Sequence, residues 1–587
     1  MTGIALITAL ICFRLPDISY IRRVTDLLKK TTTTHKLVTA LILIVTVAIY
    51  VLQVRSLYTV PVYDSVRWGG DETWLMREFG NQAAHGAMSY PETFGSPTRT
   101  DGLLAGSMWV DALIYGETGR IFSPAHDLIG TGRTVTAILG FALIASLFLI
   151  LRQLDVNPIL AAGSIAVMVV SQGFVWVTHC ARYDLLTGLA LIWYCAYLAN
   201  FSCRELYSLF DFLLFGAAAF VLIIFSRHLL TLGLPVTFVC ILFLRLWRKP
   251  KLIVSALAGG LLAALILSLA YAFGAGEFSL FGRGGSMGSY GFVLQQIPIM
   301  RPFSRNVQLS NLAERWSLFE KDIPGLLTLI MICIFLILLY KGWQWQLKRK
   351  GTLLKIATST SQRFFLLAAA LCSISWVLLQ GSRPYYLFHI VPILLIACAV
   401  VLQLWLDVYQ NRWHGPIFVV LILLSAITLQ AQHALPDVTL GEAVCKDQRA
   451  GIAHLLASTP MNSHPKCRVL VDVAGLDWAL MDTSREILTL DMFQPPANES
   501  TTISKLQQNK IDFVILRSSP VGGVFEPGRA LLPHLLDSIG ELRDSSLGFF
   551  YDDGRSYDAD LSTMINQGLD TLKLYSLNTR NFNSSTP

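Results

Sequence analysis

The stretch from Leu37 to Val54, LVTALILIVTVAIYVLQV, is apolar and free of charged side chains. A segment of about 17–25 such residues is long enough to cross a bilayer as a helix. Similar stretches recur along the 587 residues, of which 53% are hydrophobic and 14% are charged. Because soluble proteins carry about 25% charged residues, this composition predicts a polytopic α-helical membrane protein. We expect about 11 transmembrane helices, over residues 37–54, 134–151, 158–177, 185–201, 212–225, 229–246, 252–273, 324–340, 364–380, 386–404 and 416–430.

Basic residues gather in short loops between these spans, most clearly at Arg248–Lys251 and Lys348–Lys350. Cytoplasmic loops of membrane proteins carry an excess of lysine and arginine. This rule predicts a cytoplasmic N-terminal segment, a transmembrane module with two long outer loops, and an outer C-terminal domain. They cover residues 1–36, 37–430 (with loops 55–133 and 274–323) and 431–587. The net charge of +7 comes from loops between spans, so it does not indicate a nucleic-acid partner.

The outer C-terminal domain alternates strand and helix patterns. Apolar runs at Arg468–Val473, Ile487–Leu490 and Phe513–Leu516 predict strands, and Ile503–Asn509 predicts a helix. Strands that alternate with helices are typical of a small soluble α/β domain.

The outer segments hold three further features. Helical apolar spacing over Thr73–Ala84 and Leu103–Tyr115 predicts two helices that lie along the membrane surface. Gly282–Ser289 is glycine-rich but lacks the lysine and the preceding strand of a phosphate-binding P-loop, which leaves a flap over a substrate site or a plain linker. Cys445 and Cys467 share the C-terminal domain, and the sequence leaves open whether they form a disulfide.

The first candidate functional group is the carboxylate pair Asp71-Glu72, which follows the first span within Arg67–Phe79. Ionisable residues at a membrane are costly, and those that occur there tend to be functional. A carboxylate can act as general base toward an attacking hydroxyl. The alternative is a pair of acidic residues that complements the dipole at the start of the surface helix Thr73–Ala84.

More polar groups fall in the turns that the topology places on the same outer face. They are His85, Arg99, Asp101, His179, Arg182, Asp184, Arg227, His228, Arg383, Tyr385, Tyr386 and His389. Arginines bind phosphate through charge-assisted, often bidentate bonds, and a lipid-linked phosphosugar presents its phosphate at this depth. Alternatively, Arg182 and Asp184 form a structural ion pair, Arg227 and Arg383 reach lipid head groups, and the histidines pack or hydrogen-bond. Because the histidines lack metal-ligand spacing, no metal site is predicted.

Four segments carry a family resemblance. They are Asp71-Glu-Thr-Trp-Leu-Met-Arg-Glu-Phe79 with Ser89-Tyr-Pro-Glu-Thr93, Ala181-Arg-Tyr-Asp-Leu-Leu186, Ser226-Arg-His-Leu-Leu-Thr-Leu-Gly-Leu-Pro235, and Arg383-Pro-Tyr-Tyr-Leu-Phe-His-Ile-Val-Pro-Ile-Leu394. In order, spacing and sidedness they resemble the GT-C fold glycosyltransferases that use polyprenyl-phosphate sugars. This family includes protein O-mannosyltransferases and lipid A aminoarabinose transferases. The chain departs from it at Arg99 and Arg227, where the family often has lysine.

The resemblance implies an inverting glycosyltransferase in a bacterial inner membrane, with its active site and C-terminal domain facing the periplasm. Its partners would be a polyprenyl-phosphate sugar donor, a hydroxyl-bearing envelope acceptor and the bilayer. No cofactor is predicted, although two adjacent carboxylates leave a divalent metal near Asp71 and Glu72 open. Asp71 would be the general base and Glu72 would orient it or the acceptor. The expected substrate-binding residues are Arg99, Arg182, Asp184, Arg227, His228, Arg383, Tyr385 and Tyr386; among them, Asp184 would position Arg182.

Three other functions remain open from the sequence. A transporter or flippase for lipid-linked sugars would use the same basic, outward-facing pocket, although transporters often show internal repeats and none is found here. An O-antigen ligase or polymerase would use diphosphate-linked glycans. A non-catalytic membrane protein would bind an envelope partner through its C-terminal domain.

Overall fold

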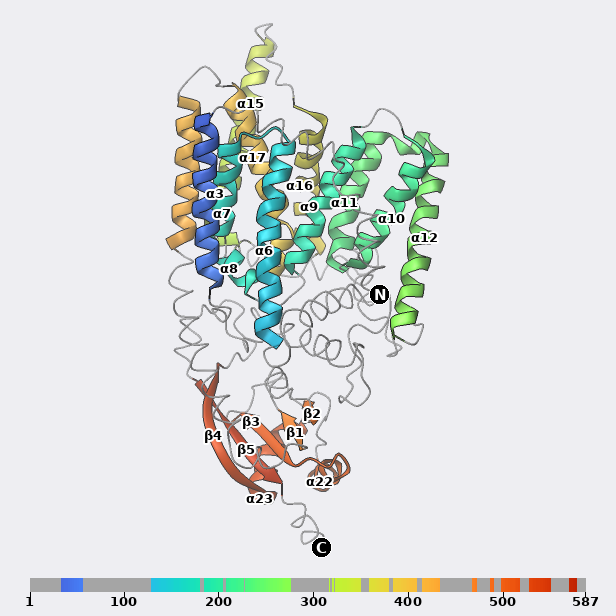
Figure 1. The fold of residues 1–587 in the computed structure, drawn as a ribbon, viewed down its shortest axis with the longest axis vertical. Coiled ribbons are helices and arrows are strands. Elements are labelled where there is room, and N and C mark those ends of the chain that lie inside the picture. The colour runs from blue at the N-terminus through green and yellow to red at the C-terminus, as the bar shows by residue number, and fades with distance from the viewer. Residues whose placement is uncertain are drawn as a thin grey trace.

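A computed structural model shows a helical bundle followed by a five-stranded sheet (Figure 1). The residues it describes are 33–55, 128–179, 184–203, 207–225, 227–275, 316, 319–320, 323–349, 358–379, 384–408, 414–432, 467–471, 486–489, 498–517, 527–550 and 569–577. The predicted surface helices Thr73–Ala84 and Leu103–Tyr115, the segment Gly282–Ser289 and Cys445 lie outside these residues.

The described part of the bundle consists of apolar helices. In chain order they are α3 (Thr33–Val54), α6 (Leu128–Gln153), α7 (Pro158–Val169), α8 (Gln172–Thr178), α9 (Asp184–Ser202), α10 (Leu209–Phe225), α11 (Arg227–Leu244), η1 (Leu246–Arg248), α12 (Pro250–Ala275), α15 (Pro324–Arg349), α16 (Thr360–Leu379), η2 (Pro384–His389), α17 (Val391–Val408) and a final helix, His414–Gln432. Each predicted span overlaps one of these helices.

Within the described residues, seven helices are long and apolar enough to cross a membrane, and the bent pair α7–α8 makes an eighth if it is one span. Shorter apolar helices cover Leu209–Phe220, Leu232–Leu244 and Pro250–Ile266. The chain is therefore a polytopic helical membrane protein, as its composition predicts. The exact number of crossings stays a prediction.

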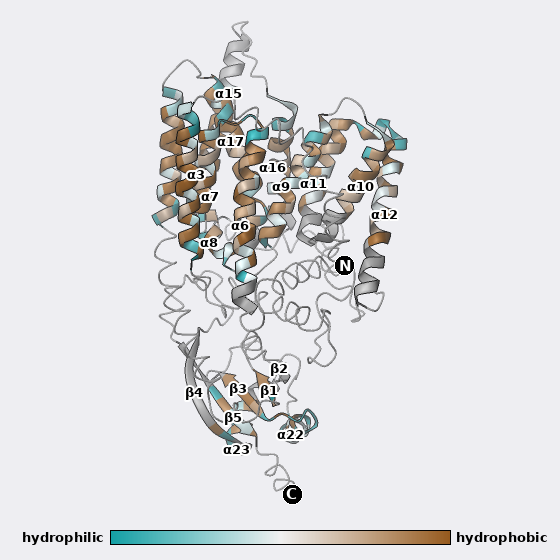
Figure 2. Ribbon diagram, viewed as in Figure 1, coloured by the Kyte–Doolittle hydropathy of each residue, from teal (hydrophilic) through white to brown (hydrophobic). Residues whose placement is uncertain are grey.

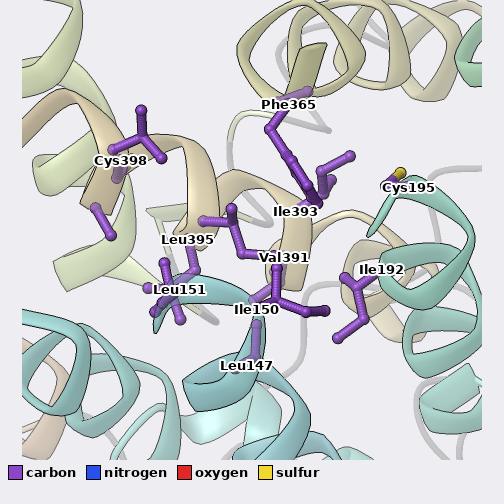
Figure 3. Close-up of a cluster of buried hydrophobic side chains, with 14 of the residues drawn as sticks. Leu147, Ile150, Leu151, Ile192, Cys195, Phe365, Val391, Ile393, Leu395 and Cys398 are labelled. Atoms are coloured by element: carbon purple, nitrogen blue, oxygen red, sulfur yellow. The ribbon is translucent and has the colours of Figure 1, made fainter. Parts of the chain in front are cut away.

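Burial separates a central helix from peripheral ones. In α9, 72% of the most apolar stretch is buried inside the bundle, against 17% in α3. The exposed faces of the outer helices are also apolar (Figure 2), as expected for surfaces that contact lipid. Figure 3 shows side chains of α6, α9, α16 and α17, among them Leu151, Ile192, Phe365 and Val391, meeting in a shared core.

One predicted span is interrupted, and another begins later than predicted. The span predicted over 158–177 breaks between α7 and α8 with a bend of 73°. There Ser171 caps α8, since its Oγ accepts a hydrogen bond from the Phe174 amide at 3.2 Å. The span predicted to start at residue 386 starts instead with α17 at Val391, because Pro384–His389 forms the 3₁₀ helix η2.

The basic ends of the bundle lie away from the C-terminal sheet. The helix α12 starts directly after η1, and α15 runs to Arg349; both of these points lie at the end of the bundle opposite the sheet (Figure 1). This arrangement agrees with the sidedness that the positive-inside rule predicts. The compartment that each end faces and the three proposed domain boundaries stay predictions.

The C-terminal domain is a five-stranded sheet of order β2-β1-β3-β5-β4. Its strands are β1 (Arg468–Val471), β2 (Glu486–Thr489), β3 (Phe513–Arg517), β4 (Gly540–Phe550) and β5 (Leu569–Leu577), with helices α22 (Glu499–Gln508) and α23 (Pro527–Ile539). The three predicted strands and the predicted helix are confirmed, and β1 pairs parallel with β2 and β3. The antiparallel ribbon of β4 and β5 completes the sheet.

Candidate functional site

The described residues place part of the predicted site at the end of the bundle that faces the sheet. Asp184 is the first residue of α9, Arg227 and His228 open α11, and Tyr385 and Tyr386 belong to η2. The neighbouring residues 180–183, 226 and 380–383 lie outside the described part of the chain, so the turns predicted there stay predictions. The other predicted site residues lie outside the described part of the chain: Asp71, Glu72, Arg99, Arg182 and Arg383.

The centre of the described site is a buried pair of an acidic and a basic side chain, Asp184 and His389. The Nε2 atom of His389 lies 2.8 Å from Oδ1 of Asp184, and both side chains are 0% exposed. A carboxylate accepts hydrogen bonds, so the imidazole N–H donates to Asp184. Charge-assisted bonds of this kind are about twice as strong as neutral ones. The pair joins the start of α9 to the end of η2 across 205 positions of sequence.

The local structure of η2 places His389 next to Asp184. Pro384 opens η2 and fixes its own φ near the helical value. The turn closes with a hydrogen bond from the Ile390 amide to the Leu387 carbonyl at 3.1 Å, after which α17 starts. His389 is therefore the last residue of η2, and Ile390 alone separates it from the buried helix α17.

The turn η2 packs closely on α9 and α8. A Cβ at Gly188 would lie 2.8 Å from the carbonyl oxygen of Phe388 and 3.5 Å from Cγ of Pro392. The ring of Phe388 also lies 6.3 Å from that of Phe174 in α8. The absence of a side chain at Gly188 thus lets the backbone of η2 approach α9, one turn along from Asp184.

A second buried histidine ties α3 to the same end of the bundle. The Nδ1 atom of His179 lies 2.5 Å from the carbonyl oxygen of Val175, and its Nε2 lies 2.9 Å from that of Gln53. The Gln53 amide in turn donates to Val169 at 3.2 Å, where α7 breaks. His179 therefore fixes the exit of α3, the helix that leads toward Asp71. Two of its partners are backbone carbonyls, and the Thr178 hydroxyl lies 3.4 Å from its Nδ1. These contacts agree with a hydrogen-bonding role.

Metal binding finds no support among the described residues. No group of three or more histidine, cysteine, aspartate or glutamate side chains is placed to hold an ion there. The histidines of the sequence likewise show no metal-ligand spacing. The prediction that the whole chain has no metal site stays a prediction.

The contact joins the first residue of α9 to the last residue of η2. Asp184 follows Arg182 in the α9 turn, and His389 closes the turn that carries Arg383, Tyr385 and Tyr386. Sequence reasoning assigned Asp184 a positioning role toward Arg182 and gave His389 only a packing or hydrogen-bonding role. No local sequence pattern predicts the hydrogen bond between Asp184 and His389, because the two residues lie 205 positions apart.

Comparisons with known proteins agree with the fold. No protein-family profile matches the sequence, and no curated protein matches it. ArnT from Cupriavidus metallidurans bound to undecaprenyl phosphate is similar with a TM-score of 0.50 and 12% identity, over 94% of this chain and 99% of that one. ArnT from the same organism in the apo state gives 0.50 and 13%, over 91% and 97%. The oligosaccharyltransferase AglB from Archaeoglobus fulgidus gives 0.46 and 14%, over 82% and 69%.

At these identities the likeness concerns architecture. It extends over nearly the full length of both chains for ArnT, and so includes the bundle and the C-terminal sheet.

Proposed function

We propose that this chain, which has a GT-C-like membrane fold, is an inverting glycosyltransferase that uses a polyprenyl-phosphate sugar. The acceptor is a hydroxyl of an envelope lipid, glycan or protein. The chain would lie in a bacterial inner membrane with its site and C-terminal domain facing the periplasm. The observation that carries the proposal is the buried contact of Asp184 with His389, which joins the start of α9 to the end of η2. In the sequence these segments follow Arg182 and Arg383, and arginines suit a phosphate.

The proposed reaction is a single displacement. Asp71 takes the proton of the acceptor hydroxyl, and the hydroxyl oxygen attacks the anomeric carbon from the face opposite the phosphate. The bond from that carbon to the phosphate oxygen breaks, and the electron pair leaves with polyprenyl phosphate. A new glycosidic bond forms with inverted configuration. Glu72 orients Asp71 or the acceptor.

Arginines supply the electrostatic part of the proposal. Arg99, Arg182, Arg227 and Arg383 hold the phosphate and stabilise the charge that develops as it leaves. Tyr385, Tyr386 and His228 add hydrogen bonds to phosphate or sugar. The ArnT structure bound to undecaprenyl phosphate supports a lipid of this class, because the two folds agree over almost their whole length.

The test is turnover by purified wild-type and Asp71→Asn protein in detergent, with radiolabelled polyprenyl-phosphate sugars and an envelope-lipid acceptor. The expected result is release of free polyprenyl phosphate by the wild type, with loss of release but retained donor binding in Asp71→Asn. Full activity in a folded Asp71→Asn protein would overturn the base assignment. Donor binding followed by transport in liposomes, without release, would favour a flippase, and binding of diphosphate-linked glycans alone would favour a ligase or polymerase.

A further inference from the structure

The turn between α11 and α12 carries a cluster of exposed basic residues. Four cations occur within the seven residues Arg245–Lys251, and the side chain of each is exposed. Arg245 adopts the left-handed conformation with a φ of 51°, and the Lys249 amide donates to the Leu246 carbonyl at 2.8 Å. The side chain of Leu246 is buried in the core of the bundle and anchors η1 there. We call Arg245, Arg248, Lys249 and Lys251 the basic turn surface.

The described part of the chain does not cancel the charge of the basic turn surface. Asp211 is the only acidic residue in the sequence from 207 to 275, and its Oδ2 accepts hydrogen bonds from the Ser208 amide and hydroxyl at 2.9 and 2.8 Å. None of the four cations forms an ion pair with a described residue. Lys249 lies over the Tyr207 ring, 5.6 Å from its centroid, and this contact leaves the ammonium charged. The surface therefore offers net positive charge to an external anion.

An exposed apolar face continues from the basic turn surface along α12. Val254, Leu257 and Leu261 follow Lys251 at intervals of three or four positions, so they share one face of the helix. They are 65%, 64% and 72% exposed. Trp247 in η1 is 55% exposed, and tryptophan is typical of the membrane–water interface. Figure 2 shows hydrophilic residues where α10 and α12 reach the end of the bundle opposite the sheet. The cations therefore lie at the depth of lipid head groups, and the apolar face lies at the depth of acyl chains.

We propose that the basic turn surface binds the head group of an anionic bilayer phospholipid, whose acyl chains lie along the exposed face of α12. Basic clusters beside membrane helices attract anionic lipids, and the guanidinium of Arg248 can form two parallel bonds to a phosphate. A free phosphate would use the cations alone, whereas a phospholipid uses both the cations and the apolar face. The surface lies at the opposite end of the bundle from the Asp184–His389 pair (Figure 1). The inference therefore goes beyond the proposed function and does not depend on it.

The experiment measures the binding of phosphatidylglycerol and of phosphatidylcholine with identical acyl chains to the purified full chain in detergent. Native mass spectrometry over a lipid titration gives the two affinities. The test variant replaces three cations of the basic turn surface by glutamine: Arg248→Gln, Lys249→Gln and Lys251→Gln. The matched control removes three exposed cations from the helices α3, α15 and α16: Lys36→Gln, Lys341→Gln and Arg363→Gln.

We expect the wild type to bind phosphatidylglycerol at least about tenfold more tightly than phosphatidylcholine, because each basic residue near the surface adds to the attraction. The test variant should lose most of this preference, and the matched control should keep most of it. Glycerol phosphate at the same concentration should not compete, since it has no acyl chains to place on α12. If the test variant does not fold, Lys251→Gln should reduce the preference, whereas Lys251→Arg should retain it.

Several results would overturn the proposal. Equal affinities of the wild type for the two lipids, or an unchanged preference in the folded test variant, would show that the basic turn surface selects no anionic lipid. An equal loss of preference in the matched control would assign the effect to the net charge of the protein. Competition by glycerol phosphate would indicate a site for a free phosphate and would overturn the assignment to a lipid.

Discussion

The contact between the C-terminal part of α3 and α6 offers a quantitative test of how the bundle packs. Tyr50 donates a hydrogen bond from its hydroxyl to the Ala137 carbonyl of α6 at 2.7 Å and is 0% exposed. Its ring stands edge-on to Phe141 with centroids 4.6 Å apart. The Tyr50 hydroxyl occupies the space in front of Gly140. A Cβ there would collide with the hydroxyl oxygen and would lie 2.8 Å from Cζ.

The geometry predicts that the effects of Gly140→Ala and Tyr50→Phe on the free energy of unfolding are not additive. Overpacking by Gly140→Ala costs roughly 1–3 kcal/mol of unfolding free energy, and the better helix propensity of alanine offsets about 1 kcal/mol of that. Tyr50→Phe loses one buried hydrogen bond, about 0.5–1.5 kcal/mol. In the double variant the colliding oxygen is gone, so Gly140→Ala should cost less there than in the wild type, by about 1 kcal/mol of coupling.

The assay is a denaturation series in mixed detergent micelles with tryptophan fluorescence as the readout, on all four proteins of the cycle. Gly342→Ala in α15 is the matched control, because nothing lies within 4 Å of the Cβ that it would add. It should be neutral or stabilising. Additivity of the Gly140 and Tyr50 effects within about 0.5 kcal/mol would refute the reasoning, as would stabilisation by Gly140→Ala alone.

Three other predictions follow from the same description. Gly216→Val should lower the thermal midpoint and the yield of folded protein, because its Cβ would collide with the Ala256 carbonyl where α10 meets α12; a midpoint equal to the wild type would contradict this close approach. Burial and the hydrogen bond to Asp537 raise the pKa of Tyr575 to about 12. Because the folded pKa lies above the unfolded value of about 10, Tyr575 stabilises the C-terminal domain below pH 10, and this contribution is lost as the pH rises through about 12. Tyr575→Phe should flatten that loss in a pH series of unfolding midpoints; an unchanged slope would show that Tyr575 does not cause it. Arg227→Gln should raise the donor KM about tenfold or more, the effect of one charged hydrogen bond, and an unchanged KM would remove Arg227 from the phosphate site.

Sequence patterns were sufficient for the features that depend on local chemistry. Long apolar stretches such as Leu37–Val54 specify helices in a bilayer, because every backbone polar group must be satisfied within the segment. The apolar run that contains β1 marks a strand for a similar reason, since parallel strands are buried on both faces. The same local pattern placed Asp184 at the start of α9, after a polar turn.

Patterns were insufficient where the backbone departs from a regular span. The bend of 73° between α7 and α8 falls at Ser171-Gln172-Gly173, a polar interruption too short to divide the apolar stretch around it, so hydropathy predicts one span. The strand β4 escaped notice because its sequence, GELRDSSLGFF, is largely polar. Among the described strands, β4 pairs with β5, which lies farther along the chain.

The sequence by itself determined that this chain is a polytopic helical membrane protein with strands and a helix in its C-terminal part, and it predicted that the polar turns share one face. Only the tertiary structure decided that Asp184 and His389 meet as a buried pair. The physical reason is that helix formation and membrane insertion depend on residues a few positions apart. The partner of a buried charge depends instead on how α9 and η2 pack, which is a contact between distant parts of the chain.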